Sequence, residues 1–447
     1  MLVNNIKISI IGLGKLGSPM LAIFAEKGFE VIGVDINSSI VNLINSGNAP
    51  FNEPQLQELL ANNKGRYFAT TKINDAVEQS DICFIIVPTP SDKNNFFINN
   101  YVISAVESVG GALKNKKRYM NVVITSTVMP GTTGTVIKNS LEKTSNRKIG
   151  KDLGLCYNPE FIALGSVVND MLNPDMLLIG ESDAKAGDML KDIYLNTVES
   201  NPICHRMNWI NAELCKLAVN TFVTTKISYA NMISDMCDHL EDANVDIVTE
   251  ALGSDSRIGK KYLKGGVAFG GPCFPRDNKA FISMGDNLGV KTDLAKATDN
   301  INDYQTKRLL NLIKSFAPKG SIISILGIAY KPNTPVIDES PGLTLARRLI
   351  NENFTVRLTD PQGILEPKNN LDFENTSFID FKKAINGSHT MVLMTPWKDY
   401  SDIDFSKLEI SYIVDPWRIF DVSKLPSRIT LIQPGIGNLS SIKKIIE

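Results

Sequence analysis

Three closely spaced glycines near the start of the chain constrain its fold more than any other feature. Gly12, Gly14 and Gly17 directly follow the β-branched run of residues 6–11 and open a segment, 19–25, with helical spacing. In a strand–turn–helix unit the first glycine permits a tight turn, the second lets a ligand approach the backbone, and the third lets helix and strand pack closely. We therefore expect the chain to begin with a doubly wound α/β sheet.

Further apolar runs support this fold class. Strand-like segments lie at residues 30–35, 82–87 and 121–125, separated by stretches of helical character. Short apolar strands that alternate with helices indicate a parallel sheet covered on both faces. In such sheets the loops that follow the strand ends bind ligands.

A long segment without glycine or proline follows. From Trp209 to Leu240 apolar residues recur every three or four positions, which predicts one long helix or two nearly continuous ones. At about 1.5 Å per residue, such a helix exceeds what one small domain can cover. We expect it to link two domains and to bury one face in a dimer; the alternative is a solvated connecting helix.

The strand–helix pattern restarts in the last third of the chain. Its first turn, residues 327–332, lacks the three-glycine spacing, so we expect this sheet to hold something other than a dinucleotide. The segments behind this expectation are strands at 321–327, 354–359, 391–395 and 412–414 and a helix at 343–350. We predict an α/β chain with two Rossmann-like, doubly wound parallel-sheet domains, 1–203 and 306–447, joined by a long central helix and a small helical domain, 204–305.

Charge and composition exclude several classes of protein. The 47 Lys plus Arg nearly balance the 48 Asp plus Glu, which argues against nucleic-acid and polybasic membrane partners. The longest apolar stretches, such as 82–87, fall far short of the roughly 18 residues of a membrane span, and the start lacks the features of a secretory signal. The six cysteines form no CxxC pair and only three histidines are present, so we expect reduced thiols and no metal site. A soluble cytoplasmic protein is expected.

An acidic residue ends the second predicted strand. Asp35 lies 18 residues beyond Gly17, where such an acid accepts hydrogen bonds from adenosine ribose hydroxyls and repels a 2′-phosphate. The start of the helix that follows the glycine turn supplies amide donors for phosphates. These features favour NAD over NADP, and a purely structural glycine turn is the alternative.

Cys273 is the first candidate for chemistry. It lies in a glycine-rich loop, residues 270–277, next to Arg276 and Asp277. Glycines let a substrate approach the backbone, and cationic neighbours favour the nucleophilic thiolate. A cysteine in a loop, taken alone, is more often inert.

Two other segments carry candidate residues. Lys216 and Asn220 are four residues apart on the predicted long helix and therefore share a face, which would suit a developing oxyanion if that face lines a cleft. The alternative is an exposed ion pair with Glu213 beside an incidental asparagine. Glu160 follows a strand-like run and is either a base or part of a structural turn.

Taken together, four segments resemble the signatures of the nucleotide-sugar dehydrogenases of the UDP-glucose and GDP-mannose 6-dehydrogenase group. In order along the chain they are 126–132, 158–161, 212–220 and 271–277. The resemblance spans nearly the whole chain, and an ordered series is more specific than any one motif. Members of this family oxidise the C6 alcohol of a nucleotide sugar to a carboxylate in two NAD-dependent steps without releasing the aldehyde.

The resemblance implies a role for each candidate. Cys273 would hold the aldehyde as a thiohemiacetal and then as a thioester, while Lys216 and Asn220 would stabilise the oxyanions. Two further residues complete this set, Asp277 and Thr127, which would position water or the reacting oxygen. Glu160 would then act as the base in thioester hydrolysis.

The resemblance also implies the binding residues. NAD would contact Gly12, Gly14, Leu16, Gly17, Asp35, Thr89, Thr127 and Arg276. The UDP-sugar would contact Phe161, Ile162, Lys216, Asn220, Arg257, Tyr262, Lys264, Gly270, Phe274, Tyr330, Lys331 and Arg418. Because Arg257 would reach the sugar of a neighbouring subunit, the resemblance implies a homodimer or a higher homo-oligomer.

Three positions depart from the family pattern. Leu164 stands where a second glutamate is common, Asp338 where an arginine near the cofactor phosphates is usual, and Lys15-Leu16 replaces an aromatic residue and a valine. The resemblance implies oxidation of UDP-glucose to UDP-glucuronate for polysaccharide precursors. Alternatives are a GDP-mannose or UDP-N-acetylhexosamine 6-dehydrogenase, a one-step alcohol dehydrogenase of the 3-hydroxyacid type, and a catalytically silent NAD-binding regulator.

Overall fold

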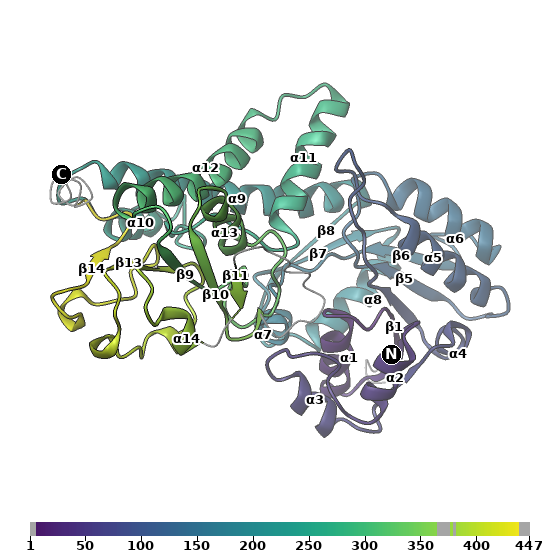
Figure 1. Ribbon diagram of the computed structural model, residues 1–447. Helices are drawn as coiled ribbons and strands as arrows, with labels where there is room; N and C mark the ends of the chain where they lie inside the picture. The colour runs from purple at the N-terminus through teal and green to yellow at the C-terminus, as the bar shows by residue number, and fades with distance from the viewer. Residues whose placement is uncertain (1–5, 364–375, 379–380, 438–447) are drawn as a thin grey trace. The chain divides into compact units, whose positions relative to one another are not determined.

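The chain forms two compact units, Met1–Ala218 and Val219–Glu447. We analysed a computed structural model, which describes residues 6–363, 376–378 and 381–437 (Figure 1). The long helix α9, Trp209–Asp238, begins in the first unit and ends in the second, and the prediction of a long central helix is confirmed. The three-domain division of the chain stays a prediction.

The first unit is built on an eight-stranded sheet with the order β3-β2-β1-β4-β5-β6-β7-β8. Its strands are β1 (Lys7–Ile11), β2 (Glu30–Val34), β3 (Tyr67–Thr70), β4 (Ile82–Ile85), β5 (Met120–Ile124), β6 (Leu153–Tyr157), β7 (Met176–Glu181) and β8 (Ile203–Met207). The parallel strands β1 to β6 follow the order of dinucleotide-binding sheets. β7 pairs antiparallel with β6, and β8 runs parallel to β7. The sheet is therefore parallel over six strands and is extended by two strands of opposite direction.

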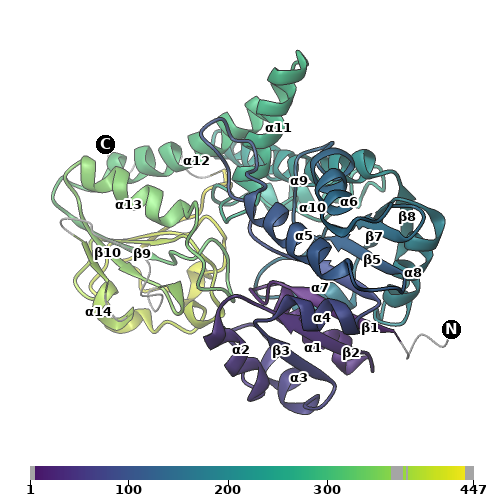
Figure 2. The same ribbon diagram turned by 90° about the vertical axis from the view of Figure 1, so that its right-hand side faces the viewer.

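Both faces of the first sheet are covered by helices (Figure 2). In β4, Ile82 and Phe84 pack into one hydrophobic cluster while Cys83 and Ile85 pack into another, as the alternation of a doubly buried strand requires. The helices are α1 (Gly17–Glu26), α2 (Ser38–Asn45), α3 (Leu56–Asn62), α4 (Ile73–Gln79), α5 (Asn100–Leu113), the π-helical turn η2 (Thr133–Ile137), α6 (Lys138–Ser145), α7 (Val167–Leu172) and α8 (Ala184–Leu195). Residues of α1, α7 and α8 pack into the first cluster and residues of α4, α5 and α6 into the second.

The second unit contains a six-stranded parallel sheet with the order β11-β10-β9-β12-β13-β14. Its strands are β9 (Ile322–Leu326), β10 (Thr355–Thr359), β11 (Thr376–Phe378), β12 (Thr390–Leu393), β13 (Tyr412–Val414) and β14 (Thr430–Ile432). Its helices are α10 (Val245–Ser254), α11 (Phe274–Leu288), α12 (Asp293–Phe316), α13 (Pro341–Asn351) and α14 (Phe381–Ile385). Counted from its own first strand, this sheet has the strand order of the parallel part of the first sheet. The expectation of two doubly wound sheets is confirmed.

Within the described residues, no helix combines the length and apolar character that crossing a membrane requires. The same part of the chain contains no cluster of three or more His, Cys, Asp or Glu residues with the arrangement of a metal site.

Candidate active site

The glycine turn after β1 is shaped by close backbone contacts. Gly12 has a φ of 97°, and a Cβ atom on it would lie 2.1 Å from the carbonyl oxygen of Ile86. A Cβ on Gly17 would lie 1.8 Å from the carbonyl oxygen of Gly12, whereas a Cβ on Gly14 would have no heavy atom within 4 Å. Any side chain at Gly12 or Gly17 would therefore clash with the backbone, whereas Gly14 leaves space before the start of α1. This space fits the pyrophosphate of a dinucleotide.

Asp35 connects the end of β2 to the glycine turn. Its Oδ2 accepts a hydrogen bond from the backbone N–H of Leu13 (2.7 Å), and its Oδ1 accepts one from the N–H of Asn37 (2.8 Å). Each carboxylate oxygen keeps a second lone pair, which a ribose hydroxyl can use. The carboxylate is thus held in place beside the turn in the position that favours NAD.

The loops after β4 and β5 are tied to each other at the same edge of the sheet. The hydroxyl of Thr89 donates to the carbonyl oxygen of Thr127 (2.8 Å), and the hydroxyl of Ser126 accepts from the N–H of Val87 (2.8 Å). Because β1, β4 and β5 are parallel, these loops lie at the carboxyl edge with the glycine turn. Thr89 and Thr127, both predicted to contact the cofactor, are thereby brought together.

Glu160 and Lys216 also meet within the first unit. The ammonium group of Lys216 donates to the backbone carbonyl of Glu160 (2.6 Å) and lies 4.6 Å from the centroid of the Phe161 ring. The Tyr194 hydroxyl lies 2.7 Å from Oε1 of Glu160 and 2.6 Å from Oδ1 of Asn158. Burial raises the pKa of Glu160, while the hydrogen bond from Tyr194 and the charge of Lys216 oppose the increase. A carboxyl group with a raised pKa is suited to proton transfer near neutral pH.

Glu213 binds the backbone of a loop and does not form the exposed ion pair with Lys216 that was considered as an alternative. Its carboxylate is fully buried and accepts hydrogen bonds from the N–H groups of Gly131 (2.6 Å) and Thr133 (2.7 Å). Glu213 therefore holds the loop that follows β5 at the start of η2. The ammonium group of Lys216 lies instead at the Glu160–Phe161 segment.

The cysteine loop lies in the second unit. Cys273 is exposed and immediately precedes α11, and its carbonyl oxygen accepts a hydrogen bond from the N–H of Asp277 (2.8 Å). The carboxylate of Asp277 is fully buried; it accepts from the side-chain amide of Asn220 (2.6 Å) and from Nε and Nη2 of Arg276 (2.9 and 2.8 Å). Three predicted residues, Cys273, Asn220 and Asp277, are therefore joined through the first turn of α11.

Two asparagines that were not predicted from the sequence, the buried Asn231 and the partly buried Asn302, hold the segment before the cysteine. Asn231 accepts from the N–H of Gly266 (2.8 Å) and donates to the carbonyl of Val267 (3.0 Å). Asn302 accepts from the N–H of Phe269 (2.7 Å) and donates to its carbonyl (3.0 Å). Asparagine is a poor helix former, so the presence of Asn231 inside the predicted long helix was an available signal, whereas no predicted element contained Asn302.

The glycines of this loop pack against the segment after β9. Gly271 has a φ of 87°, its N–H donates to the carbonyl of Asp338 (2.9 Å), and a Cβ on it would lie 2.7 Å from the Tyr330 ring. A Cβ on Gly270 would lie 2.3 Å from the carbonyl oxygen of Glu339. The loop and Tyr330, both predicted to bind substrate, are therefore in contact.

The aromatic residues of the predicted substrate loop form a chain of edge contacts. Tyr262 and Phe274 pack edge to face with ring centroids 6.1 Å apart, and Phe269 and Phe274 do so at 6.5 Å. Tyr262 has a φ of 64°. A non-glycine residue in the left-handed region costs conformational energy, which neighbouring contacts must offset.

Arg418 is fully engaged within the second unit. Its Nε and Nη2 donate to the carboxylate of Asp246 (2.6 and 2.8 Å), Nη2 also to the carbonyl of Gly265 (2.6 Å), and Nη1 to the carbonyls of Pro434 (2.9 Å) and Pro416 (2.5 Å). These five contacts use all five guanidinium donors. Arg418 thus clamps the start of the substrate loop, and its contact with a diphosphate stays a prediction.

The remaining predicted substrate residues differ in exposure. Arg257 is exposed and pairs with Asp255, Lys264 is exposed, and Lys331 is partly buried. Ile162 packs beside the first hydrophobic cluster of the sheet. The part these residues play in binding remains a prediction.

The three departures from the family pattern have distinct surroundings. Leu164 is partly buried and packs against the first hydrophobic cluster, so its side chain contributes to the core. Asp338 is exposed, and its backbone carbonyl receives the hydrogen bond from Gly271. Lys15 is exposed, whereas Leu16 packs against the core beneath α1.

Models of one protein family match most of the chain. Residues 6–198 match the NAD binding domain of the UDP-glucose/GDP-mannose dehydrogenase family, residues 210–304 match its central domain, and residues 324–424 match its UDP binding domain. The chain belongs to the UDP-glucose/GDP-mannose dehydrogenase family. The resemblance predicted from the motifs is confirmed, and NAD is the cofactor, as Asp35 and the glycine turn indicated.

Individual relatives in this family act on different sugars. The chain is 32% identical to the UDP-glucose 6-dehydrogenase AglM of Haloferax volcanii over 421 residues, covering 92% of this chain and 97% of the relative. It is 33% identical to the GDP-mannose 6-dehydrogenase of Pseudomonas aeruginosa over 358 residues, covering 79% and 81% of the two chains. Among solved structures, a UDP-glucose dehydrogenase from Pyrobaculum islandicum superimposes with a TM-score of 0.86 at 30% identity, covering 97% of this chain and 98% of that one.

Proposed function

We propose that the protein oxidises UDP-glucose at C6 to UDP-glucuronate, with two molecules of NAD and a covalent intermediate on Cys273, for polysaccharide precursor synthesis. The observation that carries this proposal is the first turn of α11. There an exposed thiol directly precedes a helix whose buried Asp277 is bound to Asn220 at 2.6 Å. A helix N-terminus favours the thiolate form of a cysteine.

The overall reaction balances as one alcohol, two NAD⁺ and one water giving one carboxylate, two NADH and three protons. Gly12, Gly14, Gly17 and Asp35 would hold NAD, which would supply the oxidant for the hydride that C6 loses in each of the two oxidations. Between them, the Cys273 sulfur adds to the aldehyde carbon and the carbonyl oxygen takes up a proton, giving a thiohemiacetal. Loss of the second hydride and of that proton leaves a thioester, whose C–S bond water then cleaves to release the acid and the thiol.

The predicted polar residues would serve the charged stages. Asn220 has one amide hydrogen on Asp277, which leaves its second amide hydrogen for a developing oxyanion. Lys216, four residues earlier on α9, lies on the same face of that helix and would add a positive charge. The buried carboxylate of Asp277 would orient the water or the reacting oxygen.

Glu160 is proposed as the base for thioester hydrolysis, together with water held by Thr127. Its pKa is raised by burial, and Tyr194 holds one of its carboxylate oxygens at 2.7 Å. Leu164 packs against the core and has no ionisable group, so Glu160 would be the single carboxylate of this segment that accepts the proton. A proton taken from the attacking water would then reside on this carboxylate.

Two observations favour UDP-glucose over GDP-mannose. The match to the family's UDP binding domain covers residues 324–424, and the UDP-glucose 6-dehydrogenase of Haloferax volcanii aligns over more of the chain than the GDP-mannose enzyme. Lys331 and Tyr330, at the start of that segment, would contact the uridine diphosphate. GDP-mannose and UDP-N-acetylhexosamines are the competing substrates.

We also propose that the active form is at least a homodimer. Phe222, Tyr229 and Met236 recur every seven residues on α9 with 63%, 45% and 52% of their surface exposed. Such a row of exposed apolar residues is a typical helix-pairing face. Arg257, also exposed, would then reach the sugar in the other subunit. Light scattering of Phe222→Glu/Met236→Glu should show the mass of a monomer, and its NADH formation should be slower than that of the unchanged protein. An unchanged mass contradicts this assembly.

A panel of nucleotide sugars tests the function. Purified protein is incubated with NAD and limiting UDP-glucose, GDP-mannose, UDP-N-acetylglucosamine or UDP-N-acetylmannosamine, and NADH is counted per sugar. Two NADH per UDP-glucose, with slower turnover of the others, supports the proposal. One NADH per sugar indicates a simple alcohol dehydrogenase, and faster turnover of another sugar changes the substrate. NAD binding without turnover on any sugar indicates a silent regulator.

A further inference from the structure

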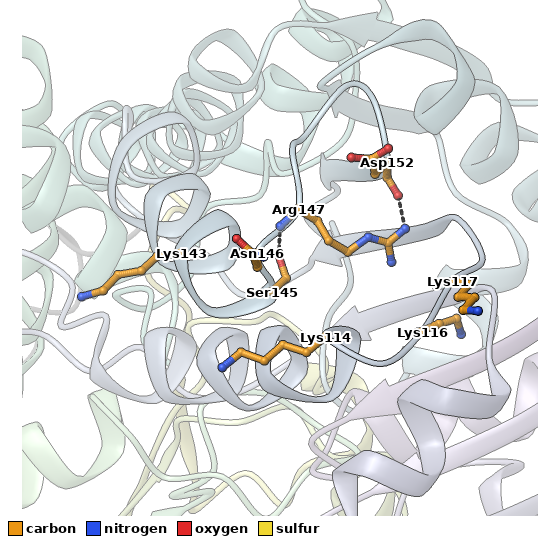
Figure 3. Close-up of a pocket in the computed structure, with 8 residues that line it drawn as sticks. All are labelled: Lys114, Lys116, Lys117, Lys143, Ser145, Asn146, Arg147 and Asp152. Carbon is orange, nitrogen blue, oxygen red and sulfur yellow. Dashed lines mark hydrogen bonds between the residues drawn. The ribbon is translucent and has the colours of Figure 1, made fainter.

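A basic pocket lies at the amino edge of the first sheet, away from the glycine turn (Figure 3). The open pocket of about 640 Å³ is lined by the end of α5 and the segment after it, and by the end of α6 and the loop that leads to β6. Its lining residues are Lys114, Lys116, Lys117, Lys143, Ser145, Asn146, Arg147 and Asp152. Five cations and one acid give this lining a formal charge of +4.

This charge is concentrated far beyond the average of the chain. The whole protein has a formal net charge of −1, so the pocket is a local exception. Two helices end here, and their carboxyl ends contribute partial negative charge of about half a unit each. Together the two helix ends therefore offset only about one unit of positive charge. Most of the formal charge of +4 on the lining remains uncompensated.

Arg147 is held in place by the backbone and keeps an unused donor group. Its Nη2 donates to the carbonyls of Arg118 (3.0 Å) and Asp152 (2.5 Å), whereas its buried Nη1 has no hydrogen-bond partner among the residues that the structure describes. In Figure 3 the guanidinium lies between Asp152 and the pair formed by Lys116 and Lys117. A buried donor without a partner costs free energy, so a shift of this guanidinium toward an acceptor in the pocket would be favourable.

Lys116 fixes the floor of the pocket. Its ammonium group donates to the carbonyls of Val77 (2.6 Å), Glu78 (3.2 Å) and Ser80, at the end of α4. Lys114, Lys117 and Lys143 are exposed, and in Figure 3 the side chains of Lys114 and Lys143 extend in the same direction from the ends of α5 and α6. The pocket thus combines one guanidinium held by backbone carbonyls with three exposed cationic side chains. The buried ammonium of Lys116 is bound to carbonyls, and burial lowers its pKa to about 8.

We propose that this pocket is a second phosphate-binding site, which takes a small ligand with three or four negative charges such as a triphosphate group. A triphosphate carries about four negative charges near neutral pH, which matches the charge of the lining. The pocket precedes β5 and β6, and the dinucleotide loops follow the parallel strands. The five residues of β5 therefore separate the two sites by about 17 Å.

The balance of the whole chain favours a small ligand over a nucleic acid. Nucleic-acid binding relies on a broad basic face that neutralises many phosphates, and such proteins carry a clear positive excess. Here the charge is confined to two short segments of a chain with net charge −1. The volume of the pocket also suits a group of a few phosphates.

Calorimetry on the full-length protein tests the proposal. Inorganic triphosphate is titrated into protein saturated with NAD, so that the glycine turn is occupied. We expect binding that weakens with salt, and a loss of affinity of about tenfold or more in Lys117→Glu/Lys143→Glu. The matched control, Lys93→Glu/Lys151→Glu, makes the same charge change at exposed positions outside the pocket and should bind within about twofold of the unchanged protein.

Four results would overturn the assignment. They are absence of heat with triphosphate, equal weakening in both double variants, competition between triphosphate and NAD, and tighter binding of single-stranded DNA than of triphosphate at the same salt concentration. Thermal unfolding of both variants, in the absence of triphosphate, verifies that they fold. The experiment measures triphosphate binding and not turnover, so its result does not depend on which sugar the protein oxidises.

Discussion

The side-chain amide of Asn220 donates to the carboxylate of Asp277 over 2.6 Å, and the backbone N–H of Asp277 bonds to the carbonyl of Cys273 over 2.8 Å. Helix α9 is thereby linked to the turn that presents the thiol. A displacement of either helix would move the proposed nucleophile relative to the amide that serves its oxyanion. The proposed nucleophile is thus positioned by a buried polar contact as well as by its own loop.

Replacing this carboxylate separates catalysis from stability. Asp277→Asn removes the charge that Arg276 and Asn220 contact, and we expect kcat to fall by about 100-fold or more. The control is Asp299→Asn, because the partly buried Asp299 also accepts from a side-chain amide, that of the buried Asn278, over 2.7 Å. Both variants should lower Tm by a few degrees, since each loses a charged hydrogen bond of about 1.5–3 kcal/mol. Equal kcat losses would show that Asp277 acts only through folding.

The thiols should differ strongly in reactivity. Burial raises the pKa of Cys83 and Cys156 to about 12, whereas Cys273 is exposed. At pH 8 a thiol with that pKa is about one part in ten thousand thiolate, so iodoacetamide should label Cys273 first. Peptide mass spectrometry measures the labelling while NADH formation is followed with UDP-glucose.

Substitution of single cysteines completes this test. Cys273→Ser should remove both the fast labelling and the turnover, while Cys204→Ser keeps both. Activity that persists after complete labelling of Cys273 would exclude the covalent mechanism.

The pH profile should report Glu160. If its ionised form is the base, the acid limb of the kcat–pH profile lies above the ordinary range of a glutamate, because burial raises its pKa. Tyr194→Phe removes a hydrogen bond that favours the carboxylate, so the limb should move further to higher pH. Tyr119→Phe, a similar change in the same unit away from Glu160, should leave the limb in place. A shift to lower pH would contradict the role of Glu160.

The same raised pKa has a consequence for stability. The folded state binds the Glu160 proton more tightly than the unfolded state, so this contribution to stability is complete below the unfolded pKa and is lost as pH rises through the folded pKa. Glu160→Gln has no charge to bury. Its Tm relative to the unchanged protein should therefore rise as pH increases from about 4.5 toward neutrality. A Tm difference that stays constant over that range would show that burial does not perturb this carboxyl.

Two glycines of the first turn should respond differently to the same added methyl group. In Gly14→Ala the Cβ meets no heavy atom within 4 Å, so Tm should be nearly unchanged while the dissociation constant for NAD rises about tenfold or more. In Gly17→Ala the Cβ would lie 1.8 Å from the Gly12 carbonyl, and a stability loss of about 1–3 kcal/mol is expected. Fluorescence titration with NADH and thermal unfolding measure the two effects. Unchanged NAD affinity in Gly14→Ala would refute the assigned place of the pyrophosphate.

Features that depend on short stretches of chain could be predicted from the sequence. The glycine turn, the strands that alternate with helices and the long central helix all follow from local spacing, because backbone sterics and the periodic burial of apolar residues act over a few positions. The family resemblance added predicted roles for Lys216, Asn220 and Cys273, based on their types and their order along the chain. The sequence shows Leu164 as a departure from the family pattern, and its packing against the core gives the reason that a leucine suits the position.

Contacts between distant segments were decided only by the tertiary structure. Glu213 was considered as a partner of Lys216 but instead caps a loop about 80 residues away, and Arg418 is saturated by Asp246 and carbonyl groups from several segments. The antiparallel pairing of β7 and the roles of Asn231 and Asn302 were likewise absent from local patterns. A polar group has many possible partners in an extended chain. Folding selects those that satisfy every buried donor and acceptor at once, and that selection depends on which segments the packed core brings together.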